Sequence, residues 1–259
     1  MKKFSVILAS VLAAAMVFGG CANNEGGNSS SSESSQGSSS KEQLIMATEA
    51  GFAPYEYYEG NNVVGVDVDI AKAIADELGM ELVIADMEFA AINPALESGK
   101  ADIGIAGMSI TPERLEEVDF SKEYATSEQV ILVKEGSDIT KPEDLHGKAV
   151  GVQLGTTADL YISEEMPDVT LQQYNKYMEA AQDLKNGRIN AIVMDKLPAQ
   201  QLLAENTDLV MLEDVLFTDT YAIAVKKGNT ELLDKINPII DQLIADGKID
   251  EFTLNHTTK

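Results

Sequence analysis

The chain has 259 residues, with 43 Asp and Glu against 19 Lys and Arg, and a formal net charge of −24 at pH 7. So acidic a surface repels nucleic acid and anionic lipid head groups, which excludes both as ligands. With one cysteine and two histidines, the sequence offers neither an internal disulfide nor a Cys/His cluster. We therefore expect no metal and no cofactor.

The first twenty residues have the pattern of a secretory signal peptide (residues 1–20). Lys2 and Lys3 precede an apolar run over residues 6–18, which is too short to span a membrane. Two glycines and Cys21 follow, an arrangement that resembles a bacterial lipoprotein processing site. There, Cys21 would become the lipidated, palmitate-bearing N-terminus. The alternative is an ordinary signal peptide that leaves an unpaired thiol in an exported protein.

Residues 22–40 consist almost entirely of Ser, Gly, Asn and Glu. Without apolar residues to bury, this stretch cannot offset its conformational entropy and should stay disordered, with an r.m.s. reach of roughly 25 Å. We expect the lipidated cysteine and the tether, residues 21–43, to hold the folded part at the outer face of the cytoplasmic membrane.

From residue 44 onward, short apolar strands alternate with helical spacing, which predicts two α/β units with parallel sheets. Gly79, Gly99 and Gly187 are expected to end helices. In the first unit, strands are expected at 44–48, 82–84 and 103–106, and helices at 70–78 and 91–98. In the second, strands are expected at 149–152, 169–172 and 191–194, and helices at 157–163, 178–186 and 198–205. A last helix is expected at 230–245.

The stretch over residues 106–121, AGMSITPERLEEVDFS, carries the strongest signal of function. Thr111 and Pro112 predict the cap and first turn of a helix, from which Arg114 would project beside a strand end. A guanidinium grips a carboxylate with two parallel hydrogen bonds and stays charged. The alternative is a solvated surface arginine among glutamates.

This stretch resembles the signature of the polar amino-acid family of extracellular solute-binding proteins, the binding components of ABC importers. The resemblance covers residues 44–252. Further matching blocks follow one order along the chain: FAPYEYYEGNNVVGVDVDIAKAIADELG at 52–79, INPALESGKADIGIAGM at 92–108, DLHGKAVGVQLGTTA at 144–158, LKNGRINAIVMD at 184–195 and YAIAVKKGN at 221–229.

The resemblance implies an α/β, two-lobed, periplasmic-binding-protein-like fold with a ligand cleft between the lobes. The first lobe would span residues 44–125 and the second 126–220, and residues 221–259 would return to the first. Crossings near residues 125–130 and 218–221 would form a two-strand hinge. In such α/β sheets, ligands bind beyond the carboxyl ends of the strands.

Two further motifs lie at expected strand ends. Gly155, Thr156 and Thr157 open a helix, where backbone N–H groups favour an anion, although an ordinary helix cap explains them equally. Asp195 ends a strand and could instead cap the next helix. The resemblance assigns Arg114, Thr156 and Thr157 to a ligand carboxylate, and Asp195, Gly107 and Ser109 to its amino group.

The candidates for recognising the ligand side chain are Glu49, Phe52 and Phe89. By resemblance, Phe52 and Phe89 lie where aromatic rings flank the ligand, although each alone is more often a core residue. Glu49 aligns with an acid found in binders of cationic amino acids, so a basic ligand such as arginine, lysine or histidine is the leading hypothesis. Its alternative is a strand-end cap in water.

The predicted function is therefore capture of a free amino acid by a monomer whose lobes close, with delivery to the transmembrane subunits of an ABC permease. We expect no catalytic residues. Two alternatives stay open. Enzymes resembling cyclohexadienyl dehydratases use the same fold, which does not fix function, and a binding module could instead report to a receptor.

Overall fold

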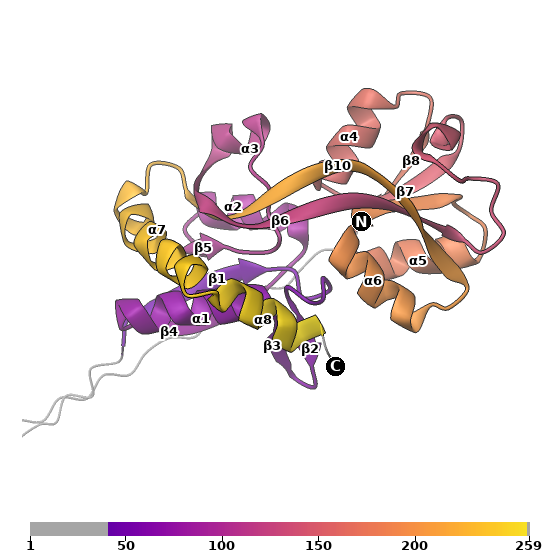
Figure 1. Cartoon of the computed structure of the whole chain (residues 1–259). Coiled ribbons are helices and arrows are strands. Elements are labelled where there is room, and N and C mark those ends of the chain that lie inside the picture. The colour runs from indigo at the N-terminus through magenta and orange to yellow at the C-terminus, as the bar shows by residue number, and fades with distance from the viewer. Residues whose placement is uncertain (1–40, 258–259) are drawn as a thin grey trace, which may run out of the picture. The chain divides into compact units, whose positions relative to one another are not determined.

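The computed structural model describes residues 41–257 (Figure 1); the predicted signal peptide, Cys21 and nearly all of the tether lie outside them. An eight-stranded sheet runs in the order β4-β1-β5-β10-β6-β9-β7-β8. At one end, β4 (Glu81–Asp86), β1 (Gln43–Thr48) and β5 (Ile103–Gly104) are parallel. At the other end, β9 (Ala191–Asp195), β7 (Ala149–Gln153) and β8 (Thr170–Tyr174) are parallel. We call these ends, with the helices on them, lobe 1 and lobe 2.

The expected strands and helices are present, although β5 is shorter than predicted. α1 ends where expected, because Gly79 adopts the left-handed conformation with φ 69°. A last helix, α8, was not foreseen. The helices are α1 (Val66–Leu78), η1 (Phe89–Ala91), α2 (Ile92–Glu97), α3 (Pro112–Glu117), η2 (Pro142–Leu145), α4 (Thr157–Glu165), α5 (Tyr177–Lys185), α6 (Lys196–Glu205), α7 (Thr230–Ala245) and α8 (Lys248–Thr257), and a hairpin joins β2 (Tyr57–Glu59) to β3 (Asn62–Val64).

Two long antiparallel strands, β6 (Val118–Lys134) and β10 (Leu209–Lys226), run from one lobe to the other (Figure 1). The two crossing segments expected from the sequence pair directly, with Tyr221 opposite Ala125 and Thr218 opposite Glu128. After β10 the chain returns to lobe 1, where α7 and α8 pack on α1. The two-strand hinge is therefore confirmed.

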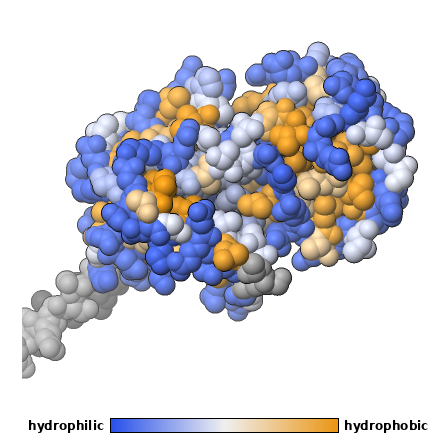
Figure 2. Space-filling model, in the orientation of Figure 1, coloured by the Kyte–Doolittle hydropathy of each residue, from blue (hydrophilic) through white to orange (hydrophobic). Residues whose placement is uncertain are grey.

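The surface of the face seen in Figure 2 is mostly hydrophilic, with hydrophobic residues gathering mainly over lobe 2. The hydrophobic side chains on β5, on β9, on β1 except the half-buried Ile45, and on residues 221–225 near the end of β10 are buried. Within residues 41–257, no helix combines the length and the apolar character needed to cross a bilayer.

Asp67 connects α1 and the segment around Gly107 to the hinge strand β6. It lies in the first turn of α1, is fully buried, and accepts hydrogen bonds from the Gly107 amide at 2.8 Å and the Tyr124 hydroxyl at 2.8 Å. Gly107 needs its lack of a side chain, because its φ is 54° and a Cβ would lie 2.8 Å from the Phe52 ring. Burial raises the pKa of Asp67 to about 6, even though these hydrogen bonds lower it.

Replacing this carboxyl should change how stability depends on pH. In the wild type, the raised pKa means that proton binding stabilises the folded state fully below about pH 4, an effect that is lost as the pH rises through about 6. Asp67→Asn cannot titrate. Its free energy of unfolding, measured in urea, should therefore rise relative to wild type by roughly 2–3 kcal/mol between pH 4 and pH 7.

Asp76→Asn is the matched control, because Asp76 is an exposed aspartate on the same helix. Its stability should follow the wild-type pH profile. A profile of Asp67→Asn that runs parallel to wild type would contradict the effect.

Candidate functional site

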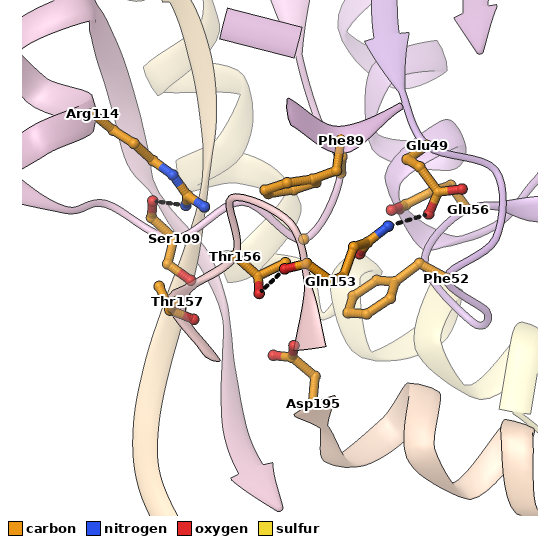
Figure 3. A pocket seen from close by; sticks show the side chains of 12 residues that line it. Glu49, Phe52, Glu56, Phe89, Ser109, Arg114, Gln153, Thr156, Thr157 and Asp195 are labelled. Carbon is orange, nitrogen blue, oxygen red and sulfur yellow. Dashed lines mark hydrogen bonds between the residues drawn. The ribbon is translucent and has the colours of Figure 1, made fainter. Parts of the chain in front are cut away.

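One pocket lies where the carboxyl ends of the lobe 1 and lobe 2 strands face each other, as open α/β sheets require. The nine residues predicted to contact a ligand all line it: Glu49, Phe52, Phe89, Gly107, Ser109, Arg114, Thr156, Thr157 and Asp195. Ala106, Glu56 and Gln153, which the sequence interpretation missed, line it too. In Figure 3, Arg114, Ser109 and Thr157 lie toward one end, and Glu49, Glu56 and Phe52 toward the other.

Arg114 is a buried residue of this pocket, so the alternative of a solvated surface arginine is wrong. The Thr111 hydroxyl caps the short helix α3 by accepting from the Arg114 amide at 3.2 Å, as expected. Arg114 as a whole residue is 8% exposed. Its Cζ lies over the Phe89 ring, 5.2 Å from the ring centroid, and its guanidinium donates a hydrogen bond to the carbonyl of Ser109. Burial lowers its pKa to about 10, so it remains charged at neutral pH.

The start of α4 presents backbone and hydroxyl groups. The Thr156 hydroxyl does cap this helix, accepting from the Asp159 amide at 3.3 Å, and it donates to the Gln153 carbonyl at 2.8 Å. The Thr157 hydroxyl donates to Asp219 at 2.6 Å. Its amide, at the first position of the helix, has no partner inside the helix. The helix-cap alternative therefore holds for Thr156, while the pocket gains the positive end of α4.

Asp195 stands at the N-cap position of α6 but makes no side-chain cap bond. Its carboxylate, which lines the pocket, instead accepts from the Tyr221 hydroxyl, so the capping alternative is wrong. Burial raises the pKa of Asp195, while hydrogen bonds from Tyr221, Ser127 and Gln129 lower it. Across residues 41–257, neither Arg114 nor Asp195 forms an ion pair within the protein.

The other end of the pocket is acidic. Glu49 is 2% exposed, which rules out a cap in water. Its carboxylate pairs with Lys176 at 3.0 Å and accepts from the Gln153 amide at 3.2 Å. Phe52 also lines the pocket. Its ring stacks on that of Tyr177, with centroids 6.2 Å apart and 26° between the ring planes.

Glu56 is fully buried, and neither of its oxygens has a hydrogen-bond donor among the described residues. Burial, followed by the neighbouring Asp67, raises its pKa well above the usual range, which favours the uncharged form of Glu56. No local pattern predicts a role for Glu56, because it lies in a loop between two tyrosines. Gln153 could have been found, since it ends a strand as Asp195 does.

Several contacts hold the two lobes together around the pocket. The Arg114 guanidinium of lobe 1 donates to the Gly155 carbonyl of lobe 2 at 2.9 Å, and the Asn175 amide donates to Glu88 at 2.9 Å. Glu49 is engaged from lobe 2 as well. The described residues contain no group of three or more His, Cys, Asp or Glu side chains able to hold a metal ion. The site is thus suited to a small ligand bearing both charges.

Comparisons with known proteins show which family the chain resembles. The chain is 34% identical over 215 residues to the arginine-binding extracellular protein ArtP of Bacillus subtilis, covering 82% of this chain and 84% of ArtP. It is 36% identical over 193 residues to the glutamine-binding protein GlnH of the same organism, covering 73% and 71%.

Among solved structures, an ancestral arginine-binding protein bound to arginine superposes with a TM-score of 0.79 and 40% identity, covering 84% of this chain and 99% of that one. Holo ArgBP from T. maritima superposes with a TM-score of 0.75 and 41% identity, covering 81% and 95%. The sequence pattern of one family matches residues 44–258. The chain belongs to the bacterial extracellular solute-binding proteins, family 3.

Proposed function

We propose that this protein is the substrate-binding lipoprotein of an amino-acid ABC importer. It binds one free amino acid between its lobes as a monomer and delivers it to the transmembrane subunits of a permease. The nine pocket residues act in the roles predicted for them, with the carboxylate held near Arg114 and the ammonium near Asp195.

The observation that carries the proposal is a pair of buried, opposite charges that the protein itself leaves unneutralised. Arg114 and Asp195 line the same pocket, each less than 9% exposed. A buried charge is costly unless it is paired. A zwitterion supplies both missing partners at once, since its carboxylate meets the guanidinium and the helix start of α4, and its ammonium meets Asp195.

The ligand side chain then points to the acidic end, where Glu49 and Glu56 accept or donate hydrogen bonds. Arginine is the leading ligand, because several relatives are named for arginine binding. Glutamine is the second, since an ancestral arginine-binding protein is described bound to it. The relatives are binding proteins, which argues against the dehydratase alternative.

Closure follows from groups that span the lobes. Arg114, which would grip the ligand carboxylate, also bonds Gly155 of the opposite lobe. A ligand bound to one lobe therefore adds contacts that stabilise the closed state. The closed form is the one that docks on the permease.

Truncating the guanidinium should abolish high-affinity binding. Titration calorimetry of the wild type with arginine, lysine and glutamine should give saturable binding with one ligand per chain. Arg114→Ala should lower the affinity for the tightest-binding of these ligands about a hundredfold or more, because breaking a buried ion pair costs on the order of 3–5 kcal/mol.

Arg188→Ala is the control, because the side chain of Arg188 is 71% exposed and pairs only with Asp183 among the described residues. It should bind as wild type does. An affinity of Arg114→Ala within tenfold of wild type would refute the site.

The lipid anchor predicted at Cys21 can be tested separately. Wild-type protein expressed in a bacterial host should partition with membranes and incorporate labelled palmitate. Cys21→Ser should appear in the soluble exported fraction without the label, because a single lipid-modified residue provides the attachment. If Cys21→Ser associates with membranes as strongly as the wild type, the prediction that Cys21 carries the lipid anchor is wrong.

A further inference from the structure

Lys176 approaches the acidic end of the pocket from the opposite lobe. It directly precedes α5 in lobe 2, and its Nζ lies 3.0 Å from Oε1 of Glu49, which follows β1 in lobe 1. The side chain of Lys176 is 44% exposed, whereas that of Glu49 is 3% exposed. The ammonium thus reaches inward from the rim to an enclosed carboxylate.

The second oxygen of Glu49 is also engaged from lobe 2. It accepts from Nε2 of Gln153 at 3.2 Å, and the same nitrogen donates to the carbonyl of Asn175, the neighbour of Lys176, at 2.8 Å. Burial lowers the pKa of Lys176, whereas Glu49, Asp86 and Tyr58 raise it, and the net direction is upward. Lys176 is therefore charged, and its ammonium is paired with the Glu49 carboxylate.

Glu56, the other acid that lines this end, is fully buried. Burial raises its pKa well above the usual range, which favours its uncharged form. A cationic ligand side chain that reaches Glu49 consequently approaches a like charge, which lies 3.0 Å from that carboxylate. A neutral amide or ureido group does not, because it can accept a hydrogen bond from the ammonium and donate one to the carboxylate.

We propose that Lys176 is a specificity-determining residue, which lowers the preference of the pocket for cationic over neutral polar amino-acid side chains. The inference rests on the proposed amino-acid-binding function. Lys176 acts on the ligand through charge, and not simply as a tether between the lobes. Other contacts already join the lobes, namely Arg114 with Gly155 and Asn175 with Glu88.

The test compares arginine with citrulline, which has nearly the same length and shape but no charge. Lys176→Met keeps a long apolar stem and removes the ammonium. Its affinity for arginine relative to citrulline, measured by calorimetry and by displacement for the weaker ligand, should rise roughly three- to tenfold over wild type, as expected for a half-exposed like charge. Lys176→Gln, which keeps a hydrogen-bond donor, should change the ratio in the same direction.

Lys148→Met is the matched control. Lys148 is also a lobe 2 lysine in an ion pair, with Asp138 at 2.7 Å, and its removal changes the net charge equally. The ratio should stay at the wild-type value. Thermal melts of all the variants identify any loss of folding.

An equal weakening of both ligands by Lys176→Met would overturn the inference, because it would make Lys176 a tether alone. An unchanged ratio would overturn it as well. A wild-type protein that binds neither these ligands nor any other amino acid would instead refute the proposed function, and this inference with it.

Discussion

The antiparallel ladder between β6 and β10 is the constraint on which the rest of the fold depends. It is the pairing that carries the sheet from lobe 1 to lobe 2, since β5 pairs with β10 on one side and β9 with β6 on the other. Its register also positions Tyr221, which bridges to the backbone of Ser109 and donates to Asp195. Tyr221 therefore links the hinge to two residues that line the pocket, so a shift of this register would displace them.

Within that frame, the pocket concentrates charges that the protein does not satisfy by itself. Arg114 and Asp195 are buried without ionic partners in the described residues, and the buried carboxyl group of Glu56 has no hydrogen-bond partner there. Each of these buried groups lowers the free energy of unfolding of the unliganded chain. This matters because the net stability of a folded domain is small. Function commonly costs stability in this way, and the ligand offsets it on binding.

Much of the fold follows from local sequence. Helix ends at Gly79 and the cap at Thr111 depend on residues near in sequence, so spacing was enough to predict them. The strand ends that carry Asp195 and Thr156 were predicted for the same reason. The signature around Arg114 and the family resemblance then brought distant strand ends into one site.

Features fixed by distant partners could not be predicted. Glu56 is buried against Asp67 and the pocket, and its surroundings come from separate elements. Lys176 and Glu49 form an ion pair although they are 127 positions apart in the sequence. The helix α8 has a weak apolar pattern and is held to lobe 1 in part by His256, whose ring contacts Tyr57 and Asp69. No short window of sequence contains both partners of such contacts.

The guanidinium of Arg114 also makes the site selective for ligands that carry a carboxylate. Two of its nitrogens donate to carbonyl oxygens, one from each lobe, and a guanidinium has five N–H donors in all. The donors left over, together with its charge, require an anionic oxygen. A decarboxylated amine of the same length, such as agmatine beside arginine, would leave that charge buried without a counter-ion. Sites built around such a group reject analogues that lack the matching one far more strongly than a change of apolar shape would. The protein should thus ignore polyamines in its surroundings, even though its surface is acidic enough to attract them.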